Sequence, residues 1–240
     1  LTDAALATLW EKTPEKLGSI SVGFADAGRM VNAVPMPPGD AWTIVAPPQA
    51  YGVQETIDQL VHALTTVAAK HPGTRPVRVN HISGKDGGWL RPHRSHQTGR
   101  DVDLAFYYLA DVPPGYRGRR EQLIDPARCW TLLKTLATET DTQVVLVDRR
   151  IQKVLSDYAL SIGEDPAFVK SLFHDGARSM VQHARRHRDH FHIRFFAPRA
   201  QELGRRVQPL LAKRPEHNLV AHRVRRGDTL GHIAMRYGST

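Results

Sequence analysis

Histidine is the residue type whose distribution in this sequence points most directly to chemistry. The 240 residues include 13 histidines, and they gather in two short segments: 91–96 holds two and 183–192 holds four. Cys129 is the single cysteine, which excludes an internal disulfide and a zinc site built from thiolates. A bound transition metal would therefore take imidazole and carboxylate ligands.

The segment 95–103, with the sequence SHQTGRDVD, places one histidine and two aspartates around a glycine turn. Gly99 permits a tight turn because glycine tolerates positive φ. His96 precedes the turn, and strand alternation puts Asp101 and Asp103 on one face of the strand that leaves it. A fold-back at this turn would bring the His96 imidazole to the Asp103 carboxylate.

The segment 190–195, with the sequence HFHIRF, has the alternation of a half-buried strand. His190 and His192 share one face, and the opposite positions hold Phe191, Ile193 and Phe195. Two imidazoles on one face, with a histidine and a carboxylate from elsewhere, can bind zinc through three protein ligands and leave one position open. Spacing alone leaves open the alternative that these are ordinary core or surface histidines.

The two segments resemble the paired signatures of the penicillin-insensitive murein endopeptidases, in the lysostaphin-type, D-Ala-D-Ala and hedgehog-like group of metallopeptidases. The first signature is SHQTG-x-DVD at 95–103, and the second is H-x-x-HFHIR at 187–194. The resemblance extends over roughly 28–196 and includes the VD-x-x-I stretch at 147–151.

The resemblance implies a Zn²⁺ site, with one ion per chain. The metal ligands that it implies are His96, Asp103 and His192. It makes His190 the catalytic histidine and places His93 and His187 in the lining of the site, His187 with a share in catalysis and His93 with a role in substrate binding. Asp101 would orient a neighbouring side chain, and Arg91 or Arg94 could hold substrate carboxylates through charge-assisted bonds.

His190 precedes a metal ligand by two residues and would lie beside a zinc-activated water, whose pKa falls toward ~7. It could accept the proton of this water as a general base, or stabilise the tetrahedral oxyanion if it is protonated. The sequence leaves both roles open, and His187 could share them.

The implied function is hydrolysis of peptide cross-links in peptidoglycan, at the D-alanyl–meso-diaminopimelyl bond. Neither Ser-x-x-Lys nor Gly-x-Ser-x-Gly occurs in the sequence, so insensitivity to β-lactams is expected. The substrate implies a periplasmic or secreted protein. The alternatives are a non-catalytic wall-binding protein and a peptidoglycan carboxypeptidase of the same group, and the oligomeric state stays open.

The formal net charge of +9 indicates a polyanionic neighbour. Nucleic acid is one candidate, but no helix-turn-helix, zinc-finger or RNA-binding signature is present. Anionic wall polymers fit the charge equally well, so we expect no nucleic-acid partner. No apolar run approaches the ~20 residues that a membrane span needs.

The elements that must position these side chains follow one another irregularly. Helices are predicted near 4–10, 53–70 and 198–211. Asp125, Asp148 and Asp165 are predicted to cap three further helices. Strands are predicted at 42–45, 77–82, 102–109, 143–147 and 190–196. This order predicts an α+β fold in which a small antiparallel sheet carries the metal site and helices flank it.

We expect an N-terminal link at 1–18, a metallopeptidase domain at 19–211, a linker at 212–221 and a partial LysM-like module at 222–240. The tail sequence 222–238, HRVRRGDTLGHIAMRYG, is similar to the opening of a LysM module, a type of module that binds N-acetylglucosamine glycans. Asp228 or Thr229 could cap its helix, whose apolar stripe is Leu230, Ile233 and Ala234. The tail stops before the module's second helix, so it is not expected to fold or bind alone. An unrelated basic capped helix is the alternative.

Overall fold

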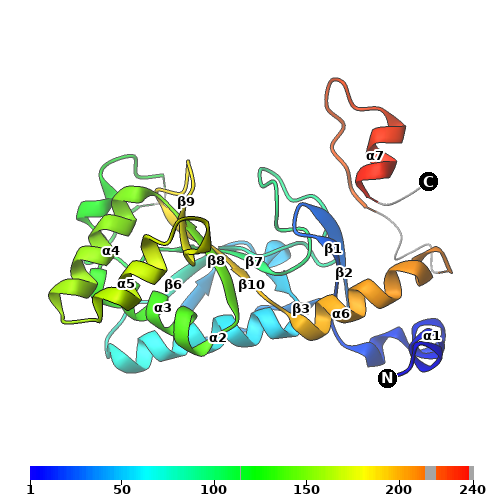
Figure 1. Ribbon diagram of the computed structural model, residues 1–240, viewed down its shortest axis with the longest axis horizontal. Coiled ribbons are helices and arrows are strands. Elements are labelled where there is room, and N and C mark those ends of the chain that lie inside the picture. Colours follow the sequence, from blue (N-terminus) through cyan, green and yellow to red (C-terminus); the bar gives the residue numbers. More distant parts are fainter. Residues whose placement is uncertain (114, 214–219, 238–240) are drawn as a thin grey trace.

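A six-stranded mixed sheet forms the centre of the computed structural model, which describes residues 1–113, 115–213 and 220–237 (Figure 1). In spatial order its strands are β4 (Trp42–Ile44), β6 (Val77–His81), β7 (Asp101–Ala105), β10 (His190–Phe195), β8 (Thr142–Val147) and β9 (Val181–His183). The four middle strands are antiparallel, whereas β4 pairs in parallel with β6, and β9 with β8.

The expected antiparallel sheet is therefore correct for the strands that carry the site histidines and wrong for both edges of the sheet. A helical crossover explains each parallel edge, because parallel neighbours need a long connection. Helix α2 (Gln54–Lys70) lies between β4 and β6 in the chain, and helices α4 (Arg149–Ser161) and α5 (Pro166–Phe173) lie between β8 and β9.

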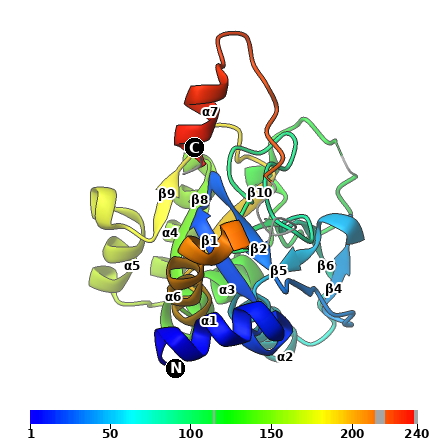
Figure 2. The same ribbon diagram turned by 90° about the vertical axis from the view of Figure 1, so that its right-hand side faces the viewer.

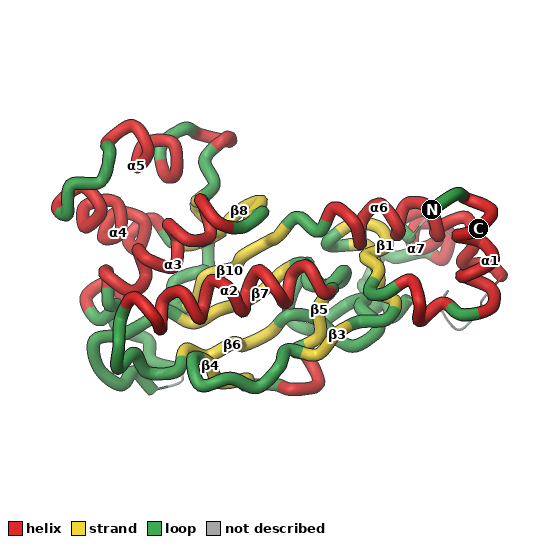
Figure 3. Tube along the Cα trace, turned by 90° about the horizontal axis from the view of Figure 1, so that it is seen from below, coloured by secondary structure: helices red, strands yellow, loops and turns green. Residues whose placement is uncertain are grey.

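Helices α2 and α3 (Pro126–Glu139) cover one face of the sheet (Figure 3). Phe191, Ile193 and Phe195 of β10 are buried in the main core, as their alternation predicts. The predicted caps of the three later helices are confirmed, because each side chain accepts a backbone N–H of its first turn. These residues are Asp125, Asp148 and Asp165.

A second apolar cluster lies away from the six-stranded sheet, where the first helix of the chain packs against α6 (Pro198–Val207) (Figure 2). Leu6 and Trp10 of α1 (Asp3–Lys12) pack there with Leu203 and Val207 of α6. The cluster also includes the hairpin of β1 (Ile20–Phe24) and β2 (Ala27–Val31), which we had not predicted. The remaining elements are β3 (Val34–Pro35), β5 (Tyr51–Gly52) and the 3-10 helices Pro14–Leu17, Pro47–Gln49, Arg120–Gln122, Gly176–Arg178 and Gln208–Lys213.

The tail contains helix α7 (Leu230–Arg236), at the position where a capped helix was predicted. Thr229 Oγ1 accepts the backbone N–H of His232 at 3.2 Å, and the Leu230 side chain is exposed. Residues 214–219 of the expected linker, and 238–240 of the expected module, lie outside the described residues. Among the described helices, none is long and apolar enough to cross a membrane.

Candidate metal centre

Three neighbouring strands place a row of polar side chains across the face of the sheet that points away from the main core. Asp103 of β7 lies directly opposite His192 of β10, and on its other side it lies directly opposite His81 of β6. Residues directly opposite in an antiparallel pair project to the same face. His81, Asp103 and His192 therefore stand side by side above the sheet.

The loop between β6 and β7 carries His96 over this row. His96 has φ of 67°, a left-handed conformation that costs a non-glycine residue about 1–3 kcal/mol. Its backbone is held from both sides: Ser83 Oγ donates to the His96 carbonyl at 2.6 Å, and the His96 N–H donates to Asp101 Oδ2 at 3.2 Å. Its ring Nδ1–H donates to the Ile82 carbonyl at 2.7 Å, which turns Nε2 toward Asp103.

Gln97 ties the same loop to the β1–β2 hairpin. Its Oε1 accepts the Gly28 N–H at 3.3 Å, and its Nε2 donates to the Asp26 carbonyl at 2.9 Å. Gly99, with φ of 66°, makes the turn where the sequence placed it. These contacts explain how a loop residue in a strained conformation keeps a fixed place above the sheet.

Three buried atoms that can each bind a metal ion lie together at this point: His96 Nε2, Asp103 Oδ1 and His192 Nδ1. The His96 nitrogen lies 3.2 Å from both the Asp103 oxygen and the His192 nitrogen, and these last two atoms are 2.9 Å apart. Ligand atoms held about 2.0–2.1 Å from zinc at tetrahedral angles lie roughly 3.3 Å from one another. The triangle thus has the size and the chemistry that a zinc ion requires.

Asp101 lies behind the triangle and binds two cationic side chains. Its Oδ1 accepts from His192 Nε2–H at 3.0 Å and from Arg194 Nε–H at 2.6 Å. Burial favours the neutral acid, but the bond with His192 and the nearby positive charges hold the pKa of Asp101 well below its usual range. Burial likewise disfavours charged His192, yet its bonds to Asp101 and Asp103 raise the pKa of His192 to about 9.

His190 stands at the rim of the triangle. Its Nε2 lies 3.6 Å from Asp103 Oδ1, and its Nδ1 lies 2.8 Å from Asp189 Oδ1. A carboxylate only accepts, so the Nδ1–H of His190 donates to Asp189 and Nε2 faces the triangle. The His190 side chain is 19% exposed, which leaves it within reach of a substrate.

His187 lies next to His190. Its ring centroid is 5.0 Å from that of His190 and 5.6 Å from that of His192. The Nδ1–H of His187 donates to the Arg185 carbonyl at 3.0 Å, and burial lowers the pKa of the His187 imidazole.

His93 lies on the opposite side of Asp103. Its Nδ1 is 3.3 Å from Asp103 Oδ2, and its Nε2 is 3.1 Å from His81 Nδ1. Burial, with the nearby charge of His96, lowers the pKa of His93 to about 4. Arg91 is exposed, and the structure gives its guanidinium no ion-pair partner among the residues that it describes.

His81 is the site residue that sequence reasoning missed. Simple alternation along β6 would point it into the core with Val77 and Val79, which are both buried. The register between β6 and β7 shifts between Val79 and His81, and this irregularity turns His81 to the face of Asp103. The sequence carries no clear signal of such a bulge.

Comparison with known proteins gave one family. The family model described as penicillin-insensitive murein endopeptidase matches residues 21–214 of the chain. The match includes the whole six-stranded sheet and both histidine segments, and it ends before α7. A search of curated proteins found no match.

Proposed function

The chain belongs to the penicillin-insensitive murein endopeptidase family, and on this premise we propose that it is a zinc metallo-endopeptidase that hydrolyses peptide cross-links in peptidoglycan. The proposed bond is the D-alanyl–meso-diaminopimelyl link that the sequence resemblance implies. The triangle of His96, Asp103 and His192 is the observation that carries the proposal, because its three possible ligand atoms lie 2.9–3.2 Å apart, close to the spacing of ligands around one zinc ion.

We propose that His96 Nε2, Asp103 Oδ1 and His192 Nδ1 hold the zinc ion. Zinc at such a site supplies Lewis acidity that activates water for attack on a peptide carbonyl. The chain itself orients the two imidazoles through their other ring nitrogens: His96 donates to the Ile82 carbonyl, and His192 donates to Asp101. Partners of this kind fix the tautomer and raise the basicity of a histidine ligand.

His190 is the proposed proton-transferring residue. Its Nδ1–H is held by Asp189, so the lone pair of Nε2 faces the triangle and can accept a proton from the attacking water. The same Nε2–H can then protonate the nitrogen of the departing amine. His187, whose ring lies 5.0 Å away, is proposed to assist in this transfer.

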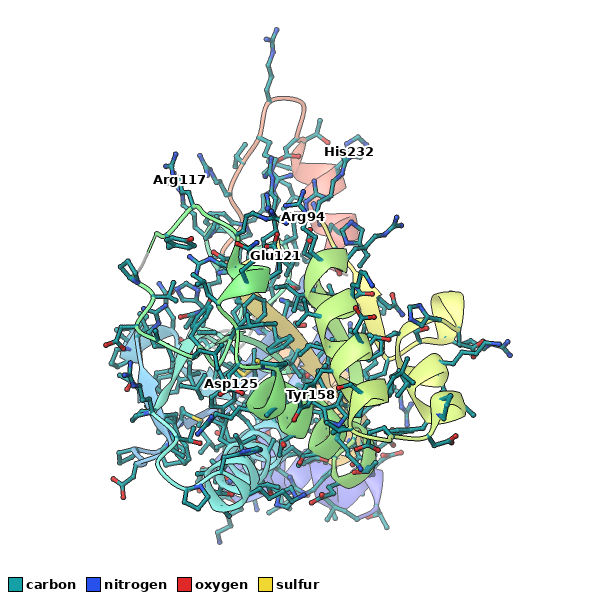
Figure 4. The ribbon with its side chains drawn as sticks, turned by 90° about the vertical axis from the view of Figure 1, so that its left-hand side faces the viewer. Arg94, Arg117, Glu121, Asp125, Tyr158 and His232 are labelled. Carbon is teal, nitrogen blue, oxygen red and sulfur yellow. The ribbon has the colours of Figure 1, made fainter. Side chains whose placement is uncertain are left out.

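Substrate binding is proposed for His93, beside Asp103, and for the exposed Arg91 two residues earlier. In the view of Figure 4, Arg94, Arg117 and His232 belong to three separate segments of the chain, and the labelled Glu121 lies beside Arg94 in the picture. The formal net charge of +9 favours an anionic polymer as partner. Peptidoglycan is the proposed partner, and a periplasmic or secreted location follows from it.

The tail is proposed to be part of a LysM-like module that holds the peptidase on wall glycan. Helix α7 begins after Thr229, where the resemblance to a LysM opening placed it. The tail also contacts the loop that carries His93 and His96, because the Arg223 guanidinium lies 5.8 Å from the centre of the Trp89 ring.

A digest of purified peptidoglycan dimers, analysed by mass spectrometry, tests the proposal. The zinc-loaded protein should convert cross-linked dimers to monomers, and the chelated protein should not. The product masses identify the bond, and release of single terminal residues would indicate a carboxypeptidase instead. Intact dimers in the presence of bound zinc would reject the endopeptidase and favour a wall-binding protein.

A further inference from the structure

We propose that the chain holds a second transition-metal site, formed by His81, His93 and Asp103, which shares the Asp103 carboxylate with the first. The chain would then bind two zinc ions, one more than the resemblance implies. The inference rests on the proposed function only in taking His96, Asp103 and His192 as the first metal site.

The two sites have the same plan, on opposite sides of Asp103. In the first, a strand histidine directly opposite Asp103 (His192) meets a loop histidine (His96). In the second, the strand histidine directly opposite Asp103 on the other neighbouring strand (His81) meets another loop histidine (His93). The ligand atoms of the second group, like those of the first, all lie within 4.8 Å of one another.

The two oxygens of Asp103 are divided between these groups. Oδ1 faces His96 at 3.2 Å and His192 at 2.9 Å, whereas Oδ2 faces His93 Nδ1 at 3.3 Å. His93 in turn lies 3.1 Å from His81 Nδ1, through its other nitrogen. One ion takes one nitrogen of His93, so only one of these two spacings is a spacing between ligands of that ion. The three ligand atoms of the group lie within 4.8 Å of one another, against roughly 3.3 Å around a bound zinc ion, so the second site would contract as the ion binds. A carboxylate with one oxygen in each group is suited to bridge two ions.

The number of imidazoles also exceeds what one ion uses. A catalytic zinc ion takes three protein ligands and keeps one open position, and the first triangle supplies all three. Four other histidines lie at the site. His187 and His190 lie next to each other near His192, and His81 and His93 contact each other. Among the described residues the His81 ring has one hydrogen-bond partner, the His93 ring. Imidazole and carboxylate together favour zinc or another transition metal over calcium or magnesium.

Metal stoichiometry tests the proposal directly. The metal-free full chain is saturated with zinc and dialysed, and bound zinc per chain is counted by elemental analysis and native mass spectrometry. The wild type should hold two ions and His81→Gln one. His62→Gln is the matched control, because His62 lies on the surface of α2 and contacts Glu139; it should hold two. His81→Phe, which keeps the ring but not its nitrogens, repeats the test with a different shape.

Cobalt provides a second readout. Two Co²⁺ ions bridged by one carboxylate interact magnetically, so the paramagnetic resonance signal of the wild type should change when His81 is replaced, while that of the His62→Gln control should not. One ion per chain in the wild type, or two in both His81 variants, would overturn the second site.

The outcomes for this site and for the proposed function are separable. A wild type with one zinc ion that cleaves peptidoglycan dimers refutes the second site and leaves the endopeptidase intact. A wild type that holds two ions, loses one on His81→Gln and leaves dimers uncut supports the second site and refutes the endopeptidase.

Discussion

The Nε2–H of His192 donates to Asp101 Oδ1 at 3.0 Å, and this bond determines which nitrogen of His192 faces the other ligand atoms. The two residues come from adjacent strands, and Arg194 binds the same carboxylate oxygen at 2.6 Å. Asp101 is fully buried, so it acts on the site through His192 and through the backbone N–H of His96, which its Oδ2 accepts at 3.2 Å. It is a positioning residue for His192, the proposed metal ligand.

Asp101→Asn should weaken zinc binding by about 10- to 100-fold, the usual loss when the hydrogen-bond partner of a metal-ligating histidine is changed. The amide lacks the negative charge that Arg194 and His192 share, so His192 loses basicity and orientation. Competition with a chromogenic chelator measures the change. Asp58→Asn is the control, because Asp58 is an exposed carboxylate that accepts from Gln54 at 2.7 Å. Equal zinc affinity for both variants would contradict the role of Asp101.

His190→Ala should keep bound zinc and lose turnover, whereas His192→Ala should lose zinc. His190 faces the triangle at 3.6 Å without belonging to it, and its loss removes a general base worth about 10²- to 10⁴-fold in rate. Zinc content and the rate of dimer cleavage, measured on the same samples, separate the two effects. Normal turnover by His190→Ala would refute its catalytic assignment.

Asp189→Asn tests the hydrogen-bond partner of His190 while leaving His190 itself in place. The amide can no longer hold the Nδ1–H of His190 as a charged acceptor, so kcat should fall with zinc content unchanged. A fall in zinc content instead would indicate that Asp189 supports the metal ligands.

Strand alternation allowed much of the site to be predicted from sequence. The inward positions of β10 are buried aromatic and aliphatic residues, so the face of His190 and His192 could be assigned before the structure. The three helix caps were predictable for a similar reason, because an aspartate at a helix start satisfies free N–H groups within its own first turn.

The parts that could not be predicted depend on partners far away in the chain. His81 reaches the site through a register shift between strands, which one strand's alternation cannot reveal. The β1–β2 hairpin turns at Ala25 and Asp26, without the Asn-Gly or Asp-Gly pair that marks a tight hairpin. The direction of the two edge strands depends on the side of the sheet to which each helical crossover brings the chain back. The sequence pattern does not predict this direction.

Gly99→Ala should destabilise the protein more than Gly73→Ala does. Both glycines have positive φ, 66° and 77°, so each alanine bears a backbone cost of about 1–2 kcal/mol. At Gly73 a new Cβ meets open space, but at Gly99 it would contact Met30 Sδ and lie 3.0 Å from the backbone of Gly52 and Val53. Denaturant unfolding of the metal-free protein measures both losses.

The same pair of variants reports on the site. Gly99 lies three residues after His96 in the same loop, so a displaced turn should also move His96. Gly99→Ala should therefore reduce zinc affinity, and Gly73→Ala should leave it unchanged. Similar losses of stability in both variants, with zinc affinity intact, would show that the loop accommodates a side chain at this turn.

The metal-free protein should be most stable near pH 6.5 and lose stability on both sides. The pKa of His192 is raised to about 9 in the folded protein, against about 6.5 when unfolded. Its contribution is therefore full below pH 6.5 and disappears as the pH rises to 9. The pKa of His93 is lowered to about 4, so the unfolded chain takes up a proton between pH 6.5 and 4 that the folded protein refuses, and stability falls there.

Each effect amounts to about 3 kcal/mol at most, since one pKa unit corresponds to about 1.4 kcal/mol. Melting temperatures of the zinc-free protein from pH 4.5 to 9.5 measure the loss of stability on the acid side and on the alkaline side of pH 6.5. His93→Gln should reduce the loss of stability on the acid side and leave the alkaline side unchanged. Part of the acid loss should remain, because burial also lowers the pKa of His81 and His187. Saturating zinc should remove the loss of stability on the alkaline side, because the ion takes the place of the proton on His192. Metal binding also strengthens as its ligands lose protons. A melting temperature that stays constant from pH 6.5 to 9.5 without zinc would contradict the charged His192 between Asp101 and Asp103.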